Sequence, residues 1–87
     1  MLDYILSEGS IGSVTLKNRF VVPPMGTGRG NTDGTFNDNI IEYYTERAKG
    51  GFGLIITEIT GIDPLSKAIP EEIMLDDDKY IPKMKEF

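Results

Sequence analysis

The sequence has 87 residues, 39% hydrophobic and 26% charged, a composition typical of an ordinary folded domain and not of a disordered or membrane-spanning chain. The net charge of −5 argues against nucleic acid as a partner, because binding to phosphates depends on Lys and Arg. Cys and His are both absent, which excludes disulfides, thiolate metal ligands, a cysteine nucleophile and the commonest general base. We therefore predict no metal site.

The N-terminus, "MLDYILSEG", carries two acidic residues and no basic segment. It is a poor secretory signal, and it predicts a cytoplasmic protein. The strongest apolar run, residues 52–56, is far shorter than the roughly 20 residues that cross a bilayer, so we expect no membrane partner.

Residues 10–17 predict a short β-hairpin, because apolar residues alternate with small or polar ones around the turn Gly12-Ser13. The run "RFVVPP", residues 19–24, then predicts a short buried strand that its two prolines end.

The stretch "NDNIIEYYTERAKGG" predicts a helix with Asn37 as N-cap and Gly50 as its C-terminal stop. One apolar stripe of this helix should face a core: Ile40, Ile41, Tyr44 and Ala48. The near-continuous apolar run in "FGLIITEIT" is typical of a parallel strand covered on both faces. Strand, helix and strand together predict a right-handed βαβ unit over residues 19–60.

Residues 61–87 are interpreted as a loop followed by the start of a second helix, with Ile81 and Met84 inside and Lys83 and Lys85 outside. The acidic cluster in this region is expected to form a solvated face: Glu71, Glu72, Asp76, Asp77 and Asp78.

A glycine-rich loop, "VVPPMGTGRGNTDG", follows the first strand. Gly26, Gly28 and Gly30 are spaced G-x-G-x-G, which fits neither the dinucleotide fingerprint nor a P-loop. At Gly30 and Gly34 we expect a positive φ that lets the chain turn. The carboxyl ends of parallel strands are where ligands bind in α/β proteins, and the two predicted strand ends carry small or apolar residues. This pattern favours a flat aromatic ligand whose polar edge is read by free backbone groups.

The segments "IGSVTLKNRFVVPPMGT" and "YYTERAKGGFGLIITE" resemble the N-terminal part of the old yellow enzyme family, closest to its NADH:flavin oxidoreductase and 2,4-dienoyl-CoA reductase branch. The resemblance implies an α/β fold, the first βαβ portion of an FMN-binding (β/α)₈ TIM barrel, with the hairpin closing the barrel bottom. It implies that FMN takes hydride from NADH or NADPH and passes it to an activated C=C bond of a small molecule, an enone or enoyl thioester.

By the same resemblance, Pro24, Met25, Gly26 and Ile59 are flavin contacts. Many relatives place Cys, Thr or His at the position of Gly26, and the hydroxyl of Thr27 is a candidate substitute. The alternative for Thr27 is a turn residue that bonds its own backbone. The resemblance implies no catalytic residue within this chain.

Three further residues have structural interpretations. Arg19, at the amino end of a strand, is expected in a salt bridge at the stability face of a barrel. Glu58 is expected to cap or pair with a neighbour at the strand end, and Tyr44 to pack in the core.

A barrel of this kind needs about 250 residues. We therefore expect residues 1–87 to be an incomplete barrel, inactive alone, whose partner is the remainder of the barrel. The alternative is a non-catalytic interaction module that self-associates through its open strand edges.

Overall fold

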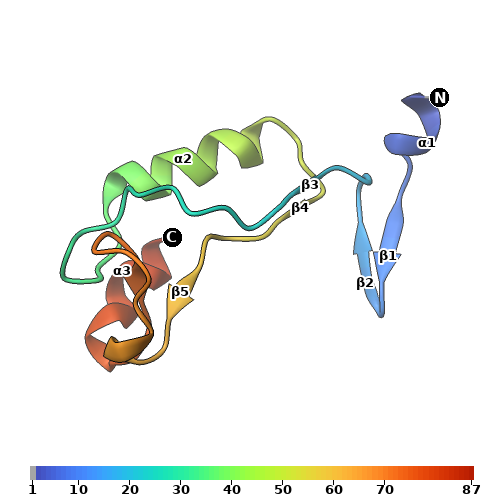
Figure 1. Cartoon of the computed structure of the whole chain (residues 1–87). Coiled ribbons are helices and arrows are strands. Elements are labelled where there is room, and N and C mark those ends of the chain that lie inside the picture. Colours follow the sequence, from blue (N-terminus) through green and yellow to red (C-terminus); the bar gives the residue numbers. More distant parts are fainter. Residues whose placement is uncertain (1) are drawn as a thin grey trace.

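The computed structural model of the chain describes residues 2–87 as short elements strung along an elongated outline (Figure 1). The principal extents are 44 × 25 × 23 Å and the Cα radius of gyration is 15.0 Å, against about 12 Å for a compact domain of this length. Among residues 2–87, no helix is both long and apolar enough to span a bilayer.

The N-terminal elements project away from the rest of the molecule (Figure 1). Helix α1 (Leu2–Ile5) is followed by the antiparallel strands β1 (Gly9–Ile11) and β2 (Val14–Leu16). The predicted hairpin forms, and Gly12 has a φ of 58°, the left-handed conformation that a two-residue hairpin turn requires.

The predicted strand–helix–strand unit is present with shorter strands than expected. Strands β3 (Val21–Val22) and β4 (Leu54–Ile55) pair in parallel, and helix α2 (Asp38–Lys49) connects them and packs on β4. The prediction that the second strand is covered on both faces is wrong for this chain, since both residues of β4 are half-buried and Ile56 is 42% exposed. A parallel strand is fully buried only when both faces of its sheet are covered.

Helix α2 begins where the sequence predicts. The side chain of Asn37 accepts a hydrogen bond from the Ile40 amide, which satisfies one of the free N–H groups of the first turn. At the other end Gly50 keeps a helical φ of −68°, and the left-handed residue is Gly51, with a φ of 97°. Gly50 is thus the C-cap that ends the helix, as predicted, and Gly51 turns the chain away from it.

A second parallel pair lies where the sequence predicts only a loop. Strand β5 (Thr60–Gly61) pairs with β6 (Ile73–Met74). Three short elements complete this region: the 3₁₀ turns η1 (Pro64–Ser66) and η2 (Asp78–Tyr80) and helix α3 (Ile81–Glu86). Two-residue strands carry no periodicity, so this pairing left no signal in the sequence.

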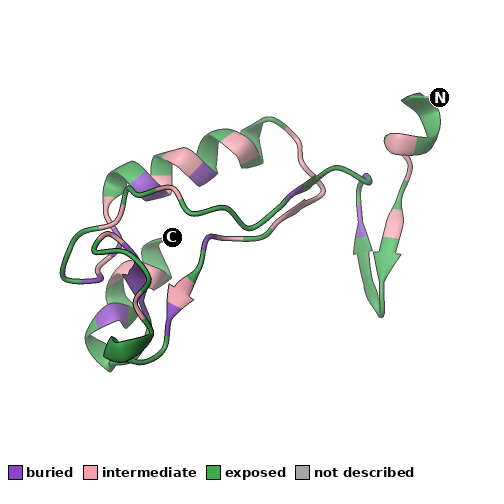
Figure 2. Ribbon diagram, in the orientation of Figure 1, coloured by how far each residue is buried: buried purple, intermediate pink, exposed green. Residues whose placement is uncertain are grey.

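The hydrophobic core gathers at the end of the molecule where α2, α3 and β6 meet (Figure 2). Its buried members are Phe36, Ile40, Tyr44 and Ile73, with Tyr43, Ile55 and Met84 packed against them. Two members of the predicted stripe are less buried than expected, since Ile41 is half-buried and Ala48 exposed.

The C-terminal helix contacts this core differently from the prediction. Met84 packs against the core as predicted, but Ile81 is 48% exposed and Tyr80 is buried in its place. The ring of Phe87 stacks against Phe36 and Tyr44, with centroids 5.4 and 5.5 Å apart. The short helix starts at Ile81 with Pro82 in its first turn, and Tyr80, just before it, takes the buried position.

The acidic cluster is not uniformly solvated. Glu72 is only 3% exposed and accepts a hydrogen bond from the Ala68 amide. Asp77 caps η2 by accepting from the Lys79 amide at 2.9 Å. The prediction of a solvated face is therefore wrong for Glu72.

Candidate functional site

The carboxyl ends of β3 and β4 lie side by side, as predicted. Beyond the last strand pair, the Ile56 amide donates to the Val22 carbonyl at 3.0 Å. Further along, the Thr27 amide donates to Oε2 of Glu58 at 2.7 Å. The segments that follow the two strands are thus bonded to each other some distance beyond the regular sheet.

Glu58 is the residue that joins these segments. Its side chain is 6% exposed, and its own amide donates to the Tyr44 hydroxyl at 2.7 Å. Tyr44 stands on α2, so three elements meet at Glu58. The prediction that Glu58 pairs with a neighbour at the strand end is confirmed, and so is the burial of Tyr44.

Burial raises the pKa of the Tyr44 hydroxyl, and the nearby Glu58 carboxylate and Tyr43 add to that rise. Hydrogen bonding to the Glu58 amide opposes it. The hydroxyl therefore stays protonated and neutral around neutral pH, in the form that can accept the Glu58 N–H without adding a buried charge.

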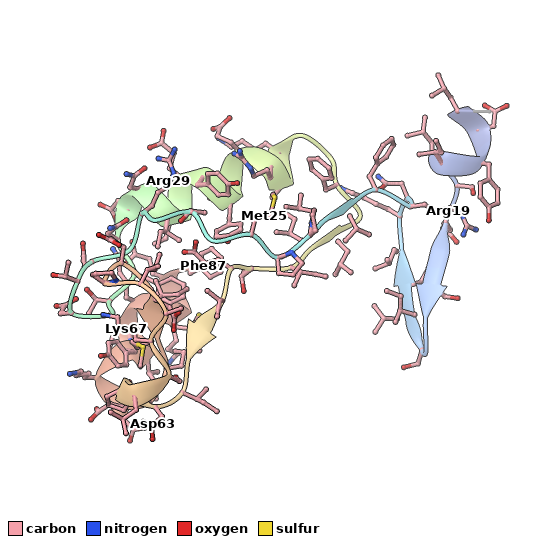
Figure 3. The ribbon with its side chains drawn as sticks, in the orientation of Figure 1. Arg19, Met25, Arg29, Asp63, Lys67 and Phe87 are labelled. Carbon is pink, nitrogen blue, oxygen red and sulfur yellow. The ribbon has the colours of Figure 1, made fainter. Side chains whose placement is uncertain are left out.

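The predicted contact residues lie on the open side of this junction. Pro24, Met25 and Gly26 are exposed, Ile59 is 55% exposed and Thr27 is half-buried. Figure 3 shows Met25 on the segment that follows β3 along α2, and Arg29 where that segment reaches the start of α2. The five residues thus lie on the two segments that follow β3 and β4 and that the Thr27–Glu58 bond joins.

This edge is open and partly apolar. A Cβ placed on Gly26 would meet no atom within 4 Å, so the backbone there faces open space. Met25 and Ile59 add apolar surface from the two strand ends, at 50% and 55% exposure. Free backbone groups can bond the polar rim of a ring system, and the apolar side chains beside them can cover its face.

The hydroxyl of Thr27 bonds the backbone of its own turn, which was the predicted alternative to a contact with the flavin. Its Oγ1 accepts a hydrogen bond from the Arg29 amide at 3.2 Å. Gly28, between them, has a φ of 67°.

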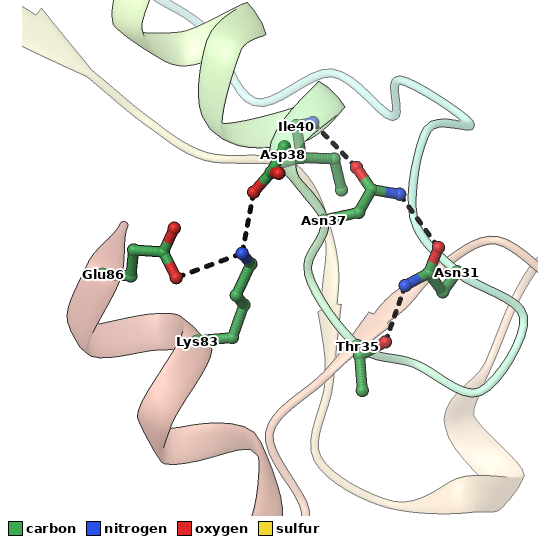
Figure 4. A network of polar contacts seen from close by, with 7 residues as sticks. All are labelled: Asn31, Thr35, Asn37, Asp38, Ile40, Lys83 and Glu86. Atoms are coloured by element: carbon green, nitrogen blue, oxygen red, sulfur yellow. Dashed lines mark hydrogen bonds and ion pairs between the residues drawn. The ribbon is translucent and has the colours of Figure 1, made fainter.

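The rest of the glycine-rich loop is ordered by polar side chains (Figure 4). The Asn37 amide group donates to the Arg29 carbonyl at 2.6 Å and to Asn31 Oδ1 at 3.0 Å. Asn31 in turn donates to the Thr35 hydroxyl at 2.8 Å. The N-cap of α2 thus also fixes the loop that precedes it, a role that the capping pattern alone does not reveal.

The glycines of this loop serve two different needs. Gly34 has the predicted positive φ, 88°, but Gly30 does not. A Cβ on Gly30 would collide with the Glu71 carbonyl, so the requirement there is close packing against the segment before β6.

Arg19 lies at the opposite end of the strand pair and forms no salt bridge among residues 2–87, contrary to the prediction. It donates to the Glu8 carbonyl at 2.7 Å and to the Ser7 hydroxyl at 3.2 Å. Its guanidinium also lies 4.4 Å from the centroid of the Tyr4 ring. These contacts tie α1 to the hairpin, which leaves Arg19 a structural residue.

Comparison with known proteins agrees with this geometry. Residues 10–87 match the model of the NADH:flavin oxidoreductase / NADH oxidase family. The chain is 46% identical over 78 residues to an NADH oxidase of Thermoanaerobacter brockii, a match that covers 88% of the chain and 12% of the relative. It is 54% identical over 54 residues to a cinnamate reductase of Clostridium sporogenes, which covers 61% of the chain and 8% of the relative.

Solved structures agree with the sequence matches. A 2-naphthoyl-CoA reductase in complex with 2-naphthoyl-CoA superimposes with a TM-score of 0.92 at 29% identity, over 98% of this chain and 13% of that one. The old yellow enzyme of Trypanosoma cruzi gives 0.82 at 28% identity, over 93% of this chain and 22% of that one. The resemblance to the N-terminal part of old yellow enzymes is confirmed, and the chain has the α/β fold of that part of their barrel.

Proposed function

Because the chain belongs to the NADH:flavin oxidoreductase / NADH oxidase family, we propose that it is the N-terminal part of an FMN-dependent enzyme that reduces activated C=C bonds. Enzymes of this family use FMN with NADH or NADPH. The chain spans 12% or less of the two curated relatives described above, so the activity proposed is that of a larger assembly.

One observation carries the proposal. Residues Pro24, Met25 and Gly26 are exposed, and the Thr27–Glu58 hydrogen bond holds their segment to the one that carries Ile59. In this proposal the backbone of Pro24, Met25, Gly26 and Ile59 bonds the polar edge of the isoalloxazine. The side chains of Met25 and Ile59 exclude water from its face.

When bound, FMN supplies hydride transfer from NADH or NADPH to the alkene. An enone or an enoyl thioester is the proposed substrate class, in keeping with the names of two relatives, a cinnamate reductase and a 2-naphthoyl-CoA reductase. We assign no catalytic residue to this chain, whose part is to bind and orient the flavin.

The remaining elements have proposed places in the complete barrel. The hairpin β1–β2 would close the barrel bottom, at the end of the β3–β4 pair opposite to the flavin contacts. The open edges of β3 and β4 would pair with the strands of the remaining barrel, as unpaired strand edges require. Cytoplasmic localisation stays a prediction from the N-terminal sequence.

The test is flavin retention. The chain is mixed with FMN and gel-filtered, alone and together with a Thermoanaerobacter brockii NADH oxidase that lacks the segment matched by this chain. We expect the yellow flavin absorbance to co-elute with the mixture and not with the 87-residue chain alone. If neither sample retains FMN although the two polypeptides co-elute, the proposal is wrong.

A matched pair of variants sharpens this test. Gly26→Trp places in the open space beside the strand end a side chain bulkier than the Cys, Thr or His that many relatives carry. It should weaken flavin retention strongly without disturbing the fold of the chain, because its Cβ meets no atom within 4 Å. Gly12→Asn, in the distant hairpin turn, should retain flavin as the parent chain does, because Asn tolerates the left-handed conformation.

The alternative function, a self-associating interaction module, rests on exposed apolar side chains along the open strands, such as Val21 and Ile56 at 40% and 42% exposure. Light scattering on the eluted chain separates the two. A stable oligomer that persists when the barrel remainder is added, and that binds no flavin, would favour the module.

A further inference from the structure

We propose that Glu58 is the positioning residue of the flavin edge: its carboxylate fixes the segment of Pro24–Thr27 against that of Ile59, while the Tyr44 hydroxyl holds its backbone amide. The identity of the ligand in this inference rests on the proposed function, whereas the hydrogen bonds of Glu58 rest on the structure alone. By "strap" we mean the chain of two hydrogen bonds from Tyr44 through Glu58 to Thr27.

The first argument is where the strap lies. The bond from the Thr27 amide to Glu58 spans 31 residues of sequence, and it is made beyond the last backbone pairing between β3 and β4. Within residues 2–87, the last backbone hydrogen bond between the two segments joins Ile56 to Val22. Without the Thr27–Glu58 bond, no hydrogen bond beyond that point would hold the segment after β3 to the segment after β4. A free segment of several residues would sample many conformations before it could bond a ligand edge.

The second argument is the strength of this bond. A backbone N–H that donates to an ionised carboxylate forms a charge-assisted hydrogen bond, which is roughly twice as strong as a neutral one. The N···O distance of 2.7 Å is at the short end of the usual range, and the carboxylate is 6% exposed, so water competes weakly for it.

The third argument is that Glu58 is poorly suited to a purely structural role. Its Oε1 is buried and has no hydrogen-bond partner within residues 2–87. Leaving a buried carboxylate oxygen without a donor destabilises the fold, so its presence at this position calls for an explanation beyond packing. An apolar residue would satisfy the core at this point, but it could not hold the Thr27 amide.

Tyr44 supplies the rigidity. It belongs to the hydrophobic core, it is 5% exposed, and its hydroxyl takes the Glu58 N–H. The backbone of Glu58 is therefore held by α2 as well as by the strand that precedes it. This arrangement makes Glu58 a residue that acts through Thr27 and not one that touches the ligand.

A matched control exists in the same chain. Glu72 is also buried, at 3% exposure, and also has one unpartnered oxygen, Oε2. Its bonded oxygen closes only a local loop to Ala68, four residues away. Removing each carboxylate in turn separates the effect of losing a buried charge from the effect of losing the strap.

The test compares Glu58→Ala, Glu58→Gln and Glu72→Ala in the full chain by amide hydrogen exchange. We expect Glu58→Ala to speed exchange at Thr27 by about tenfold to a hundredfold, the range for a lost hydrogen bond to a charged group. Amides of α2, which report whether the fold survives, should change by less than about threefold. Glu58→Gln keeps an acceptor and should show a smaller effect at Thr27, while Glu72→Ala should affect Ala68 and leave Thr27 unchanged.

The second readout is FMN affinity of the same variants, measured by flavin fluorescence with the chain assembled with the barrel remainder. Glu58→Ala should weaken binding about tenfold or more, and Glu72→Ala should leave it within about twofold. Unchanged exchange at Thr27 in Glu58→Ala, or equal effects of the Ala and Gln variants, would overturn the strap. Faster exchange with unchanged FMN affinity would overturn the positioning role.

The two proposals fail in different ways. A parent chain that binds no FMN in the assembly contradicts the proposed function, and with it the assignment of a flavin edge, whereas exchange at Thr27 still decides the strap. Tyr44→Phe gives an independent check: it removes only the hydroxyl, and it should speed exchange at the Glu58 amide while the aromatic packing stays.

Discussion

At the β5–β6 pair, Ile73 is fully buried and Met74 is 3% exposed, whereas at the β3–β4 pair Val21 is 40% exposed and both residues of β4 are only half-buried. The first pair is held by apolar packing against α2. The second is held at its two ends by buried polar side chains: Asn18, which donates to the Gly51 carbonyl at 2.7 Å, and Glu58.

The difference shows two ways of stabilising a short parallel pair. Apolar packing needs a covered face, which α2 and α3 give to the β5–β6 corner. Polar ties at the strand ends leave the edges of the β3–β4 pair free, as a ligand-binding and strand-pairing surface requires. Mutations in the two regions should therefore differ both in the size of their effect and in the measurement that detects it.

The largest effect is expected at the packed corner. Ile73→Ala should lower the free energy of unfolding by about 2–5 kcal/mol, because it leaves a cavity in the core. Urea denaturation followed by circular dichroism measures this. Ile62→Ala, at a side chain 80% exposed, is the control and should stay within about 0.5 kcal/mol of the parent chain. Equal losses at both positions would mean that the corner is not packed as described.

The next effect in size concerns the loop that joins the two regions. Gly34→Ala should cost about 1–3 kcal/mol, because Gly34 has a φ of 88° and a Cβ there would come within 2.5 Å of Met74 Cγ. Gly26→Ala, in open space, should leave the thermal midpoint nearly unchanged. A large shift for Gly26→Ala would show that the open edge is covered.

A moderate effect is expected at Asn37. Replacing it by Ala should destabilise α2 by about 1 kcal/mol through loss of the cap. Asn37→Asp keeps the capping oxygen and removes the donor to the Arg29 carbonyl, so α2 should stay protected in hydrogen exchange while the loop before it exchanges faster. Loss of α2 protection in the Asp variant would contradict this division of roles.

The smallest effect is electrostatic. Lys83 on α3 donates to Asp38 at 2.7 Å and to Glu86 at 3.1 Å, and these bonds, first that to Asp38, raise the pKa of the Lys83 ammonium (Figure 4). A pKa raised on folding gives a stabilisation that is complete below the unfolded-state pKa and is lost as the pH rises through the folded-state pKa.

The raised pKa of the Tyr44 hydroxyl acts with the same sign, because the unfolded chain ionises first. We therefore expect stability to be flat from neutral pH to about pH 9 and to fall above about pH 10. Thermal midpoints across this range check it. In Lys83→Gln the fall should begin from a slightly lower plateau and be shallower; an identical profile would exclude Lys83 as a contributor.

The sequence predicted the local elements well where they carry a local signal. The cap at Asn37 and the turn at Gly12 depend on side chains and backbone preferences within a few residues, and both form as predicted. The parallel order of β3 and β4 was predicted from the connecting helix, because parallel neighbours need a crossover of a dozen or more residues, usually an α-helix.

The predictions that were wrong concern contacts between distant segments. Glu72 was expected in a solvated face and is buried. Ile81 turned outward because Tyr80 took the core position. Each of these positions depends on the segments that pack against it. A shift of one residue in a helix or loop changes which side chain is buried, and composition does not reveal such a shift.

What the sequence determined by itself is the set of segments: the hairpin, the capped helix, the two strands and, through the motifs around Pro24 and Ile59, the family. What only the tertiary structure decided is how these segments are held at the site. The bond from Thr27 to Glu58 crosses 31 residues, and the tie from Tyr44 to Glu58 crosses 14. No local preference encodes either, because a hydrogen bond between distant residues forms only after the packing of α2 on the strands has brought donor and acceptor within reach.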